Sequence, residues 1–281
     1  MSLALTKIKS RIRSIDGAYK VTKAMKLVST VKLQKWKGKM NESSLYTSKL
    51  KEISDDVLKC DENIDSPYVK TNDEVNKDLY VVITSSLGLC GSYNANIFHF
   101  FDKIYKNDDE IIILGNKGLV HYEQILPNLN TDFKDYSSLK DEKIIKNLLR
   151  YILSSYENKK IRSVHIIYTH YKNSITFEVK DFRLLPLKTE KNNSNIGYDP
   201  IFEPSKKELV EKIIPLVIEN QLFSKLLESE VSEQGSRCNA MDNATNNAEE
   251  LLSELQIEFN KARQSAITQE IVEIVAASKG M

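Results

Sequence analysis

The sequence is poor in the residues that mark many small binding sites. Its three cysteines, Cys60, Cys90 and Cys238, lie far apart and form no C-x-x-C pair, which argues against a zinc site and a disulfide framework. They fit a reducing compartment. There is no run of about 18 apolar residues, so no membrane span is expected. These absences argue against the disulfide-rich secreted and zinc-finger classes.

The first residues also lack the apolar core of a signal peptide. They enter a helical pattern at once, so we expect no removable targeting segment. Hydrophobic residues make up 41% of the 281 residues and charged residues 28%. This composition supports one large or two modest folded domains and argues against global disorder.

Proline and glycine are nearly missing from the two ends of the chain, which favours two very long helices. Between Leu3 and Leu58 there is no proline, and between Ser205 and Ala277 the only proline is Pro215. In both segments, apolar or small residues alternate at spacings of four and three, as in helices that pack along one seam. The N-terminal seam is Ile8, Ile12, Ile15, Tyr19 and Thr22, continued with drift by Met25, Val28, Val31 and Trp36. The C-terminal seam is Met241, Thr245, Ala248, Leu252, Leu255, Phe259, Ala262 and Ala266.

The middle of the chain has a different pattern, in which Val- and Ile-rich runs alternate with helical segments. This alternation predicts βαβ units and a parallel sheet. The expected strands are Leu79–Thr84, Glu110–Gly115, Ser163–Tyr171 and Ile175–Leu185, and the expected helices are Asn94–Tyr105 and Lys143–Tyr156. The polar segment Lys188–Pro200 is expected to be a loop that leads to the last helix.

Neither long helix can leave its apolar stripe in water, so we expect the two to pair. They should be antiparallel, because the middle segment connects them as a large insertion. The predicted fold class is α/β: a long antiparallel coiled coil of the N- and C-terminal helices with an inserted Rossmann-like α/β domain. The expected boundaries are 1–60 for the first helix, 75–195 for the α/β domain and 205–281 for the last helix.

Charge is divided unevenly between the two ends, although the net charge of the chain is only +1. Residues 1–40 contain nine lysines, two arginines and one aspartate, a net charge of +10. Residues 205–281 contain eight basic and thirteen acidic residues, a net charge of −5. Opposite charges favour helix pairing modestly, and the positive surplus on the first helix suits an acidic partner.

The segment SSLGLCGSYNANI, residues 85–97, follows a predicted strand and precedes a predicted helix, where nucleotide-binding proteins hold phosphate. Gly88 and Gly91 are three residues apart and no lysine follows, so the Walker A pattern is absent, as is G-x-G-x-x-G. A second pair, Gly115 and Gly118 in ILGNKG, is a weak signal by itself. We therefore expect Gly88 and Gly91 to form a structural turn with positive φ angles and close packing.

A chain with GLCG at the end of its first strand and with these two terminal segments resembles the gamma subunit of F-type rotary ATP synthases. The stretch IKSRIRSIDGAYKVTKAMKLVSTVKL, residues 8–33, is similar to that family's N-terminal helix. NATNNAEELLSELQIEFNKARQSAITQEIVEIV, residues 243–275, is similar to its C-terminal signature. The resemblance covers both ends of the chain and the start of the insert.

The resemblance implies a central rotor shaft that is not itself catalytic. In that family the two terminal helices form a coiled coil inside a ring of alpha and beta subunits, and the globular domain contacts epsilon and the membrane rotor ring. ATP, ADP and Mg²⁺ bind on alpha and beta, so no cofactor or metal is expected in this chain. The shaft would couple ATP synthesis or hydrolysis to rotation and ion transport, as a peripheral subunit at the cytoplasmic face of a bacterial cell membrane.

Several site residues carry over with the resemblance. Contacts with the beta subunit are implied for Arg263, Gln264, Thr268 and Glu270 in ARQSAITQE, with Met25 and Lys26 facing the same region from the first helix. The chain's end is apolar around most of its circumference, so a bearing tip turning in an apolar sleeve is expected from Ile271, Val272, Ile274 and Val275. Acidic loops of beta would be met by the lysines at 20, 23, 26, 32, 35, 37 and 39.

Three alternatives stay open. Ser86 and Leu87 stand where the family usually has an acidic and a basic residue, which leaves room for a specialised paralogue whose motor drives another output. A basic coiled-coil protein that binds nucleic acid is disfavoured, because few aromatic residues lie among the lysines and the last helix offsets much of the charge. An enzyme is also disfavoured, because His121, His165 and His170 lack partners at catalytic spacing. His165 and His170 also fall on opposite faces of a strand.

Overall fold

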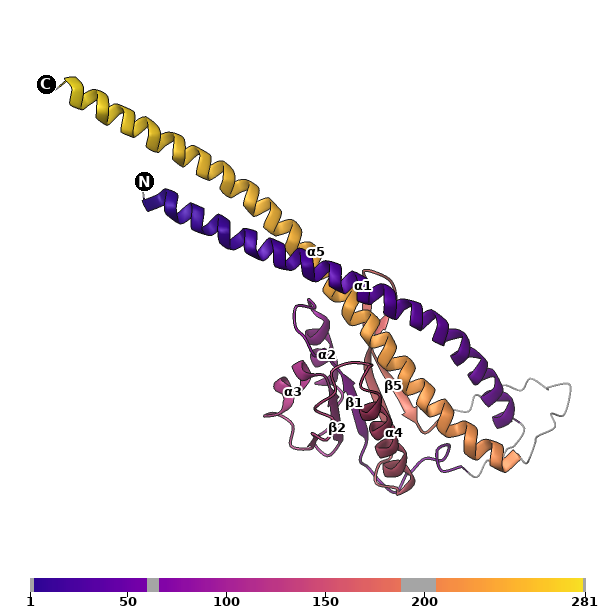
Figure 1. Cartoon of the computed structure of the whole chain (residues 1–281). Helices are drawn as coiled ribbons and strands as arrows, with labels where there is room; N and C mark the ends of the chain where they lie inside the picture. The colour runs from indigo at the N-terminus through magenta and orange to yellow at the C-terminus, as the bar shows by residue number, and fades with distance from the viewer. Residues whose placement is uncertain (1–2, 60–65, 188–205, 280–281) are drawn as a thin grey trace. The chain divides into compact units, whose positions relative to one another are not determined.

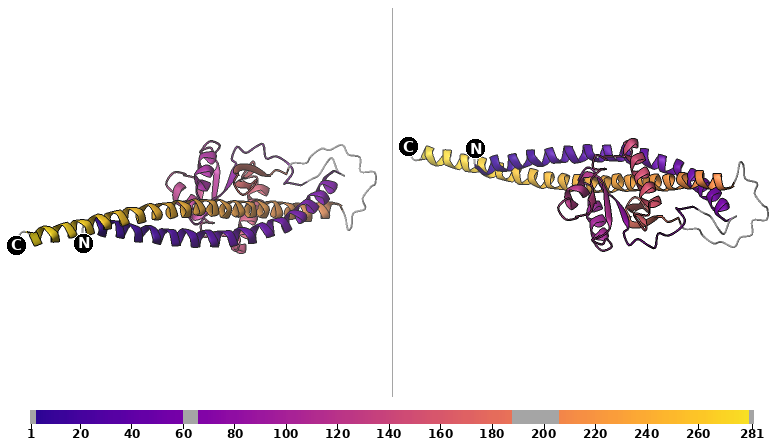
Figure 2. Two further views of the ribbon diagram at one scale, coloured as in Figure 1. Left: turned by 90° about the horizontal axis from the view of Figure 1, so that it is seen from above. Right: turned by 90° about the horizontal axis from the view of Figure 1, so that it is seen from below.

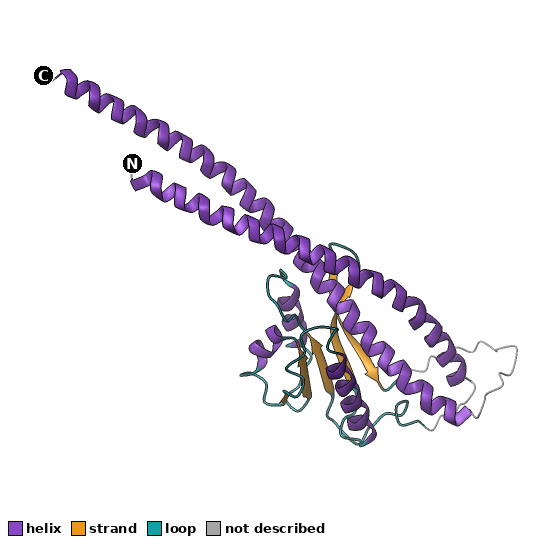
Figure 3. Ribbon diagram, viewed as in Figure 1, coloured by secondary structure: helices purple, strands orange, loops and turns teal. Residues whose placement is uncertain are grey.

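The structure is a computed structural model that describes residues 3–59, 66–187 and 206–279 (Figures 1 and 3). Cys60 and the predicted loop Lys188–Pro200 lie outside these ranges. The elements follow the order α1 (Leu3–Lys59), β1 (Leu79–Ile83), α2 (Tyr93–Phe101), β2 (Glu110–Leu114), α3 (Asn116–Tyr122), β3 (Leu129–Asn130), α4 (Glu142–Glu157), β4 (Val164–Tyr171), β5 (Phe177–Leu185) and α5 (Lys206–Lys279).

The chain folds as two compact units. One contains residues 1–30 with 237–281 and is called the helix-pair unit; the other contains residues 31–236 and is called the sheet unit. The two long helices contribute to both units, so the unit boundaries fall within helices rather than at the helix ends that the sequence suggested. Within each unit, α1 and α5 lie side by side (Figure 2).

In the helix-pair unit, contacts between side chains show that α1 and α5 are antiparallel. The hydroxyl of Thr22 accepts a hydrogen bond from Thr245 at 3.0 Å, and Lys26 forms an ion pair with Asp242. Thr30 lies 3.3 Å from the sulfur of Cys238. As the residue numbers rise along α1, those of the partners fall along α5. The predicted antiparallel pairing is confirmed.

The predicted seam is confirmed over most of its length and wrong in one stretch. Every position of the C-terminal seam, and of the N-terminal seam up to Thr22, is buried or half-buried. Val28 and Val31, however, are exposed, whereas Ser29 is buried and Lys26 is half-buried. The alternate spacing of four and three continues through these two polar residues. The seam is polar at this point, so the prediction that placed the apolar residues Val28 and Val31 on it was wrong.

The sheet unit has a five-stranded sheet in the order β3-β2-β1-β4-β5. Strands β3, β2, β1 and β4 are parallel, as predicted, and β5 pairs antiparallel with β4. The four expected strands and both short helices are present. Helix α3 and the two-residue strand β3 were not expected, because both are too short for a periodic pattern to reveal them.

Both faces of the sheet are covered, because neighbouring residues of a strand point to opposite faces. Helices α4 and α5 cover one face, and α2 and α3 cover the other. The first cluster includes Val81, Ile166, Leu148 of α4 and Leu222 of α5, and the second includes Val82, Ile113, Ile97 of α2 and Tyr122 of α3. A fully buried Leu or Ile contributes about 1.5–3 kcal/mol, so several such contacts hold α5 on the sheet.

Candidate functional site

Among the described residues, the C-terminal part of α5 has no stretch of α1 opposite it in the helix-pair unit. Both helices rise by the same 1.5 Å per residue, so extending the register of the three cross-helix contacts puts Leu3, where α1 begins, opposite residue 264 or so. The following residues of α5 are exposed. They include the predicted bearing tip, with exposed fractions of 55% for Ile271, 61% for Val272, 68% for Ile274 and 46% for Val275.

Such a run of exposed apolar side chains on one helix end needs an explanation. Single exposed apolar residues are ordinary, but contiguous ones mark an interaction surface. The side chains carry no hydrogen-bonding group, so a partner surface would hold them without directional bonds. This is the property that a rotating bearing requires.

The residues predicted to contact beta on α5 are exposed near the start of this end. Arg263, Gln264, Thr268 and Glu270 all face solvent, and the Thr268 hydroxyl donates to the Gln264 carbonyl at 2.9 Å. Gln264 and Thr268 also line a surface hollow together with Lys261. Their amide and charged groups are available to a partner, and the contact itself stays a prediction.

Met25 and Lys26 do not face the same region as these residues. Lys26 is opposite Asp242, which lies 21 residues before Arg263 on α5, or roughly 30 Å along the helix. The hydrogen bond to Asp242 raises the pKa of Lys26 above its ordinary value. The Lys26 ammonium is thus engaged within the chain, with 39% of its side chain still exposed. The structure therefore separates the predicted beta contacts into two groups.

The glycine segment after β1 forms a turn, but not with the predicted backbone angles. Gly91 has a φ of 60°, whereas the other left-handed residue is Leu89, with a φ of 62°, and not Gly88. Asn94 fastens the loop, since its side-chain oxygen accepts from the Ser85 N–H at 3.0 Å and its side-chain nitrogen donates to the Ser85 hydroxyl at 2.7 Å. The segment is a side-chain-locked turn.

The second glycine pair, Gly115 and Gly118, packs against Thr84. The Thr84 hydroxyl donates to the carbonyl of Leu114 at 3.0 Å and accepts from the Gly118 N–H at 3.1 Å. A Cβ at Gly115 would lie 2.2 Å from the Thr84 carbonyl oxygen, and one at Gly118 would lie 2.6 Å from the Thr84 hydroxyl oxygen. Thr84 therefore packs directly against both glycines, where any side chain would clash with it.

His165 has the partners that the sequence analysis did not find. Its Nδ1 is 2.8 Å from the carboxylate of Asp181, and its Nε2 is 2.9 Å from the hydroxyl of Ser163. This is the order of groups in a serine hydrolase, but the Ser163 hydroxyl donates to Asp78 at 2.6 Å. A serine hydroxyl has one proton, so none remains for His165 to abstract. The sequence missed the arrangement because the two carboxylates lie far away along the chain.

The remaining groups of this network are structural. Asp78 also accepts from Arg162 Nε at 3.1 Å. Burial opposes the charge on Asp78, but the hydrogen bonds from Arg162 and Ser163 outweigh it and lower the pKa of that carboxyl. His165 stacks on Tyr80 at 5.2 Å between ring centroids. Together these contacts fasten the starts of β1 and β4.

His121 and His170, the other two histidines considered for catalysis, also have structural partners. His121 stacks on Phe98 with 4.2 Å between ring centroids, and His170 forms a hydrogen bond with Glu228 of α5. Residues 3–59, 66–187 and 206–279 contain no group of three His, Cys, Asp or Glu side chains that could hold a metal ion. Among the helices described, none is both long and apolar enough to cross a membrane.

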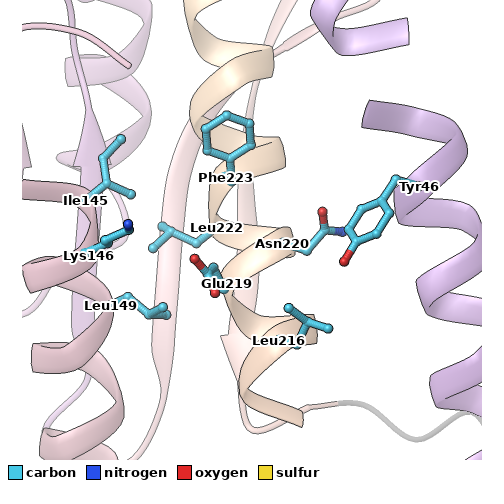
Figure 4. A pocket seen from close by; sticks show the side chains of 9 residues that line it. All are labelled: Tyr46, Ile145, Lys146, Leu149, Leu216, Glu219, Asn220, Leu222 and Phe223. Atoms are coloured by element: carbon cyan, nitrogen blue, oxygen red, sulfur yellow. The ribbon is translucent and has the colours of Figure 1, made fainter. Parts of the chain in front are cut away.

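The sheet unit contains an apolar pocket of about 270 Å³ between α1, α4 and α5 (Figure 4). Its lining is mainly Ile145, Leu149, Leu216, Leu222 and Phe223. Asn220, on the side facing α1, is tied to Thr47 by a 3.0 Å hydrogen bond. Tyr46, Lys146 and Glu219 add polar groups to this lining.

Comparison with known proteins agrees with these features. A family model described as ATP synthase matches residues 4–281. The ATP synthase gamma chain of Clostridium novyi is 36% identical over 278 residues, which cover 98% of this chain and 97% of the relative. The ATP synthase gamma chain of Mycoplasma mobile is 38% identical over 281 residues, 98% of each chain.

A solved structure has the same fold. A chain of the Euglena gracilis mitochondrial ATP synthase, in the structure of its OSCP/F1/c-ring, matches with a TM-score of 0.65 at 20% identity. The match covers 99% of this chain and 94% of that chain. Full-length agreement with curated relatives above 30% identity is decisive, and the chain belongs to the ATP synthase gamma chain family.

Proposed function

We propose that this chain is the central rotor shaft of an F-type ATP synthase. The observation that carries the proposal is the end of α5, where exposed apolar side chains continue past the start of α1. A shaft needs a stiff helix pair and a tip that contacts its sleeve without directional bonds. In this function the chain couples ATP synthesis or hydrolysis on partner subunits to rotation and ion translocation.

The proposed partners are the alpha and beta subunits around the shaft, with an epsilon-like subunit and the membrane rotor ring at the sheet unit. The exposed groups of Arg263, Gln264, Thr268 and Glu270 suit switchable hydrogen bonds with one beta subunit at a time. ATP, ADP and Mg²⁺ would bind on the partners and not on this chain. The proposed location is peripheral, at the cytoplasmic face of a bacterial cell membrane.

The curated relatives favour this function over the alternatives. Both relatives described above are named ATP synthase gamma chain, and the match covers at least 97% of each of them. This disfavours a specialised paralogue that drives another output. The same relationship disfavours a nucleic-acid-binding protein. Salt-sensitive DNA binding by the purified chain would revive that second alternative.

The proposal is tested by reconstitution with the alpha and beta subunits of the same organism. Rotation and ATP hydrolysis are measured for the wild type and for Ile274→Asp, which puts a charge into the expected sleeve. A matched control is Val120→Asp on α3, since Val120 and Ile274 are both 68% exposed. We expect Ile274→Asp to slow rotation or prevent assembly, because burying an unpaired carboxylate is costly, and Val120→Asp to behave as wild type.

Two results would overturn the proposal. One is a wild-type chain that forms no rotating complex with alpha and beta. The other is an Ile274→Asp variant that assembles and rotates at the wild-type rate, since the tip would then lie outside any sleeve.

A further inference from the structure

His165, on β4, lies in the middle of a chain of hydrogen bonds in the sheet unit. Its Nδ1 lies 2.8 and 3.0 Å from the two carboxylate oxygens of Asp181 on β5. Its Nε2 lies 2.9 Å from the Ser163 hydroxyl oxygen, and that oxygen lies 2.6 Å from Asp78, the residue before β1. Each group donates or accepts a fixed number of hydrogen bonds, so the contacts determine where the protons are.

Asp78 is ionised and forms the fixed end of this chain of hydrogen bonds. Its carboxylate accepts from Arg162 Nε at 3.1 Å and forms an ion pair with the same guanidinium. Burial acts against the charge, but the hydrogen bonds from Arg162 and Ser163 outweigh it and lower the pKa of Asp78. An ionised carboxylate has no proton to donate, so the Ser163 hydroxyl is the donor in its contact with Asp78.

Both ring nitrogens of His165 therefore need a hydrogen. The one proton of the Ser163 hydroxyl points to Asp78, so toward His165 the serine oxygen is an acceptor and Nε2 must donate. The Asp181 carboxylate also only accepts, so Nδ1 must donate as well. A neutral imidazole has one N–H and satisfies one of these two contacts, whereas an imidazolium satisfies both.

The charges around the ring also favour an imidazolium. Only 18% of the His165 side chain is exposed, so neighbouring charges act on it with less screening than at the surface. The charged groups on the elements packed against it are the carboxylates of Asp78, Asp109 and Asp181 and the guanidiniums of Arg162 and Arg183. Tyr80, on which the ring stacks, stays neutral, because burial and next Asp109 raise its pKa to about 12. The carboxylates exceed the guanidiniums by one, and an imidazolium balances this charge.

We propose that His165 is doubly protonated in the folded chain at neutral pH and acts as a pH-sensitive clamp on β5. With both protons, the ring connects Asp181 of β5, a strand at the edge of the sheet, to Ser163 and through it to Asp78. When the ring loses a proton, one of its two contacts has no hydrogen between the atoms, and the connection weakens. The clamp goes beyond the shaft role, because it uses none of the residues expected to contact alpha or beta.

The clamp makes the stability of the sheet unit depend on pH in one direction. A histidine in an unfolded chain loses its second proton near about pH 6.5. Above that pH, the folded chain holds a proton on His165 that the unfolded chain has released. The folded state then binds more protons than the unfolded state, so the free energy of unfolding decreases as the pH rises.

The test records the imidazole ¹⁵N signals of the full chain by NMR at pH 7.5, where an ordinary histidine is about 90% neutral. The two nitrogens of an imidazolium have similar chemical shifts, whereas a neutral ring has one nitrogen without hydrogen and with a very different shift. We expect the imidazolium pattern for His165. The neutral pattern is expected for His121, which stacks on Phe98 and has no carboxylate partner among the described residues. The spectrum of His165→Gln identifies the His165 signals.

A variant of the carboxylate partner tests the clamp itself. Asp181→Asn removes the charged acceptor at Nδ1 and should give His165 the neutral pattern at pH 7.5. Asp135→Asn, at an exposed position of the same unit, is the matched control and should leave the imidazolium in place. In urea unfolding, the wild-type midpoint should be lower at pH 9 than at pH 7, with a smaller decrease for Asp181→Asn. The proposal is overturned if wild-type His165 gives the neutral pattern at pH 7.5, or if Asp181→Asn keeps the imidazolium.

Discussion

At the scale of single residues, close packing where β1 and β2 end leaves no room for a side chain at two glycines. Thr84, which directly follows β1, forms hydrogen bonds with the end of β2 and with the start of α3. Gly115 has a φ of 107°, which other residues rarely adopt, and Gly118 is in contact with the Thr84 side chain. The ILGNKG pair thus exists for packing rather than for phosphate.

Replacing Gly115 by alanine should destabilise the sheet unit by about 3 kcal/mol or more, since strain and a backbone clash add. Gly38→Ala is the matched control, because nothing lies within 4 Å of its Cβ position and the residue is inside α1. That change should stabilise by about 0.5–1 kcal/mol. Urea unfolding of both variants measures the difference. Equal effects at the two positions would contradict the packing argument.

Asp78 makes the stability of the sheet unit depend on pH. Its pKa in the folded state is below the ordinary value of about 3.9, so its contribution is present above that pH and is lost as the pH falls through the folded pKa. Asp78→Asn should cost about 2 kcal/mol at pH 7, because the hydrogen bonds from Arg162 and Ser163 then reach a neutral group.

The measurement is urea unfolding between pH 7 and pH 3. The difference between wild type and Asp78→Asn should shrink toward the acid end. A difference that stays constant over this range would show that the carboxyl charge is not what stabilises the fold.

At the scale of elements, the pairing of α1 with α5 in the helix-pair unit passes through a polar stretch. Thr22, Lys26 and Thr30 meet Thr245, Asp242 and Cys238, where a coiled coil usually has aliphatic side chains. Polar residues at seam positions lower stability but select one register, because a shift would leave them without partners. The stretch therefore fixes which turn of α1 meets which turn of α5.

A double-mutant cycle at Thr22 and Thr245 tests this stretch. Each single valine variant should destabilise by up to about 1 kcal/mol, since one hydroxyl loses its cross-helix partner. The double variant should cost less than the sum of the two, because an apolar pair replaces a polar one. Thr268→Val is the control, with the same bond to the carbonyl four residues earlier but no cross-helix contact. Additive effects in thermal unfolding would contradict the pairing.

At the scale of the whole molecule, the uneven charge matters more for association than for folding. Residues 1–40 carry a net charge of +10, and the cross-helix ion pair of Lys26 with Asp242 neutralises only one of these positive charges. An exposed surplus of one sign attracts an acidic partner over distances set by the salt concentration. The lysines of α1 should therefore speed assembly with an alpha and beta ring.

Lys20→Gln combined with Lys23→Gln should slow this assembly severalfold at low salt, with little difference near 1 M salt. Lys143→Gln combined with Lys146→Gln removes the same charge from α4 and should leave the rate unchanged. Stopped-flow mixing with purified alpha and beta follows the rate. An equal slowing by both pairs would mean that total charge, and not its position on α1, decides the rate.

The sequence by itself determined the long helices, their antiparallel pairing, the four main strands and the family. These features depend on local periodicity and on the terminal motifs, such as ARQSAITQE, which are visible in one stretch of chain. The thirteen seam positions, five from Ile8 to Thr22 and eight from Met241 to Ala266, are all buried or half-buried, and they repeat at the spacing with which side chains return to one face of a helix.

Only the tertiary structure decided the rest. Ser29 and Lys26 belong to the seam although they are polar, and Leu89 rather than Gly88 takes the left-handed turn position. Asp78 and Asp181 meet the Ser163–His165 pair across strands. Such contacts depend on sheet register and on helix packing, which bring together residues that are distant along the chain, so no local pattern in the sequence specifies them.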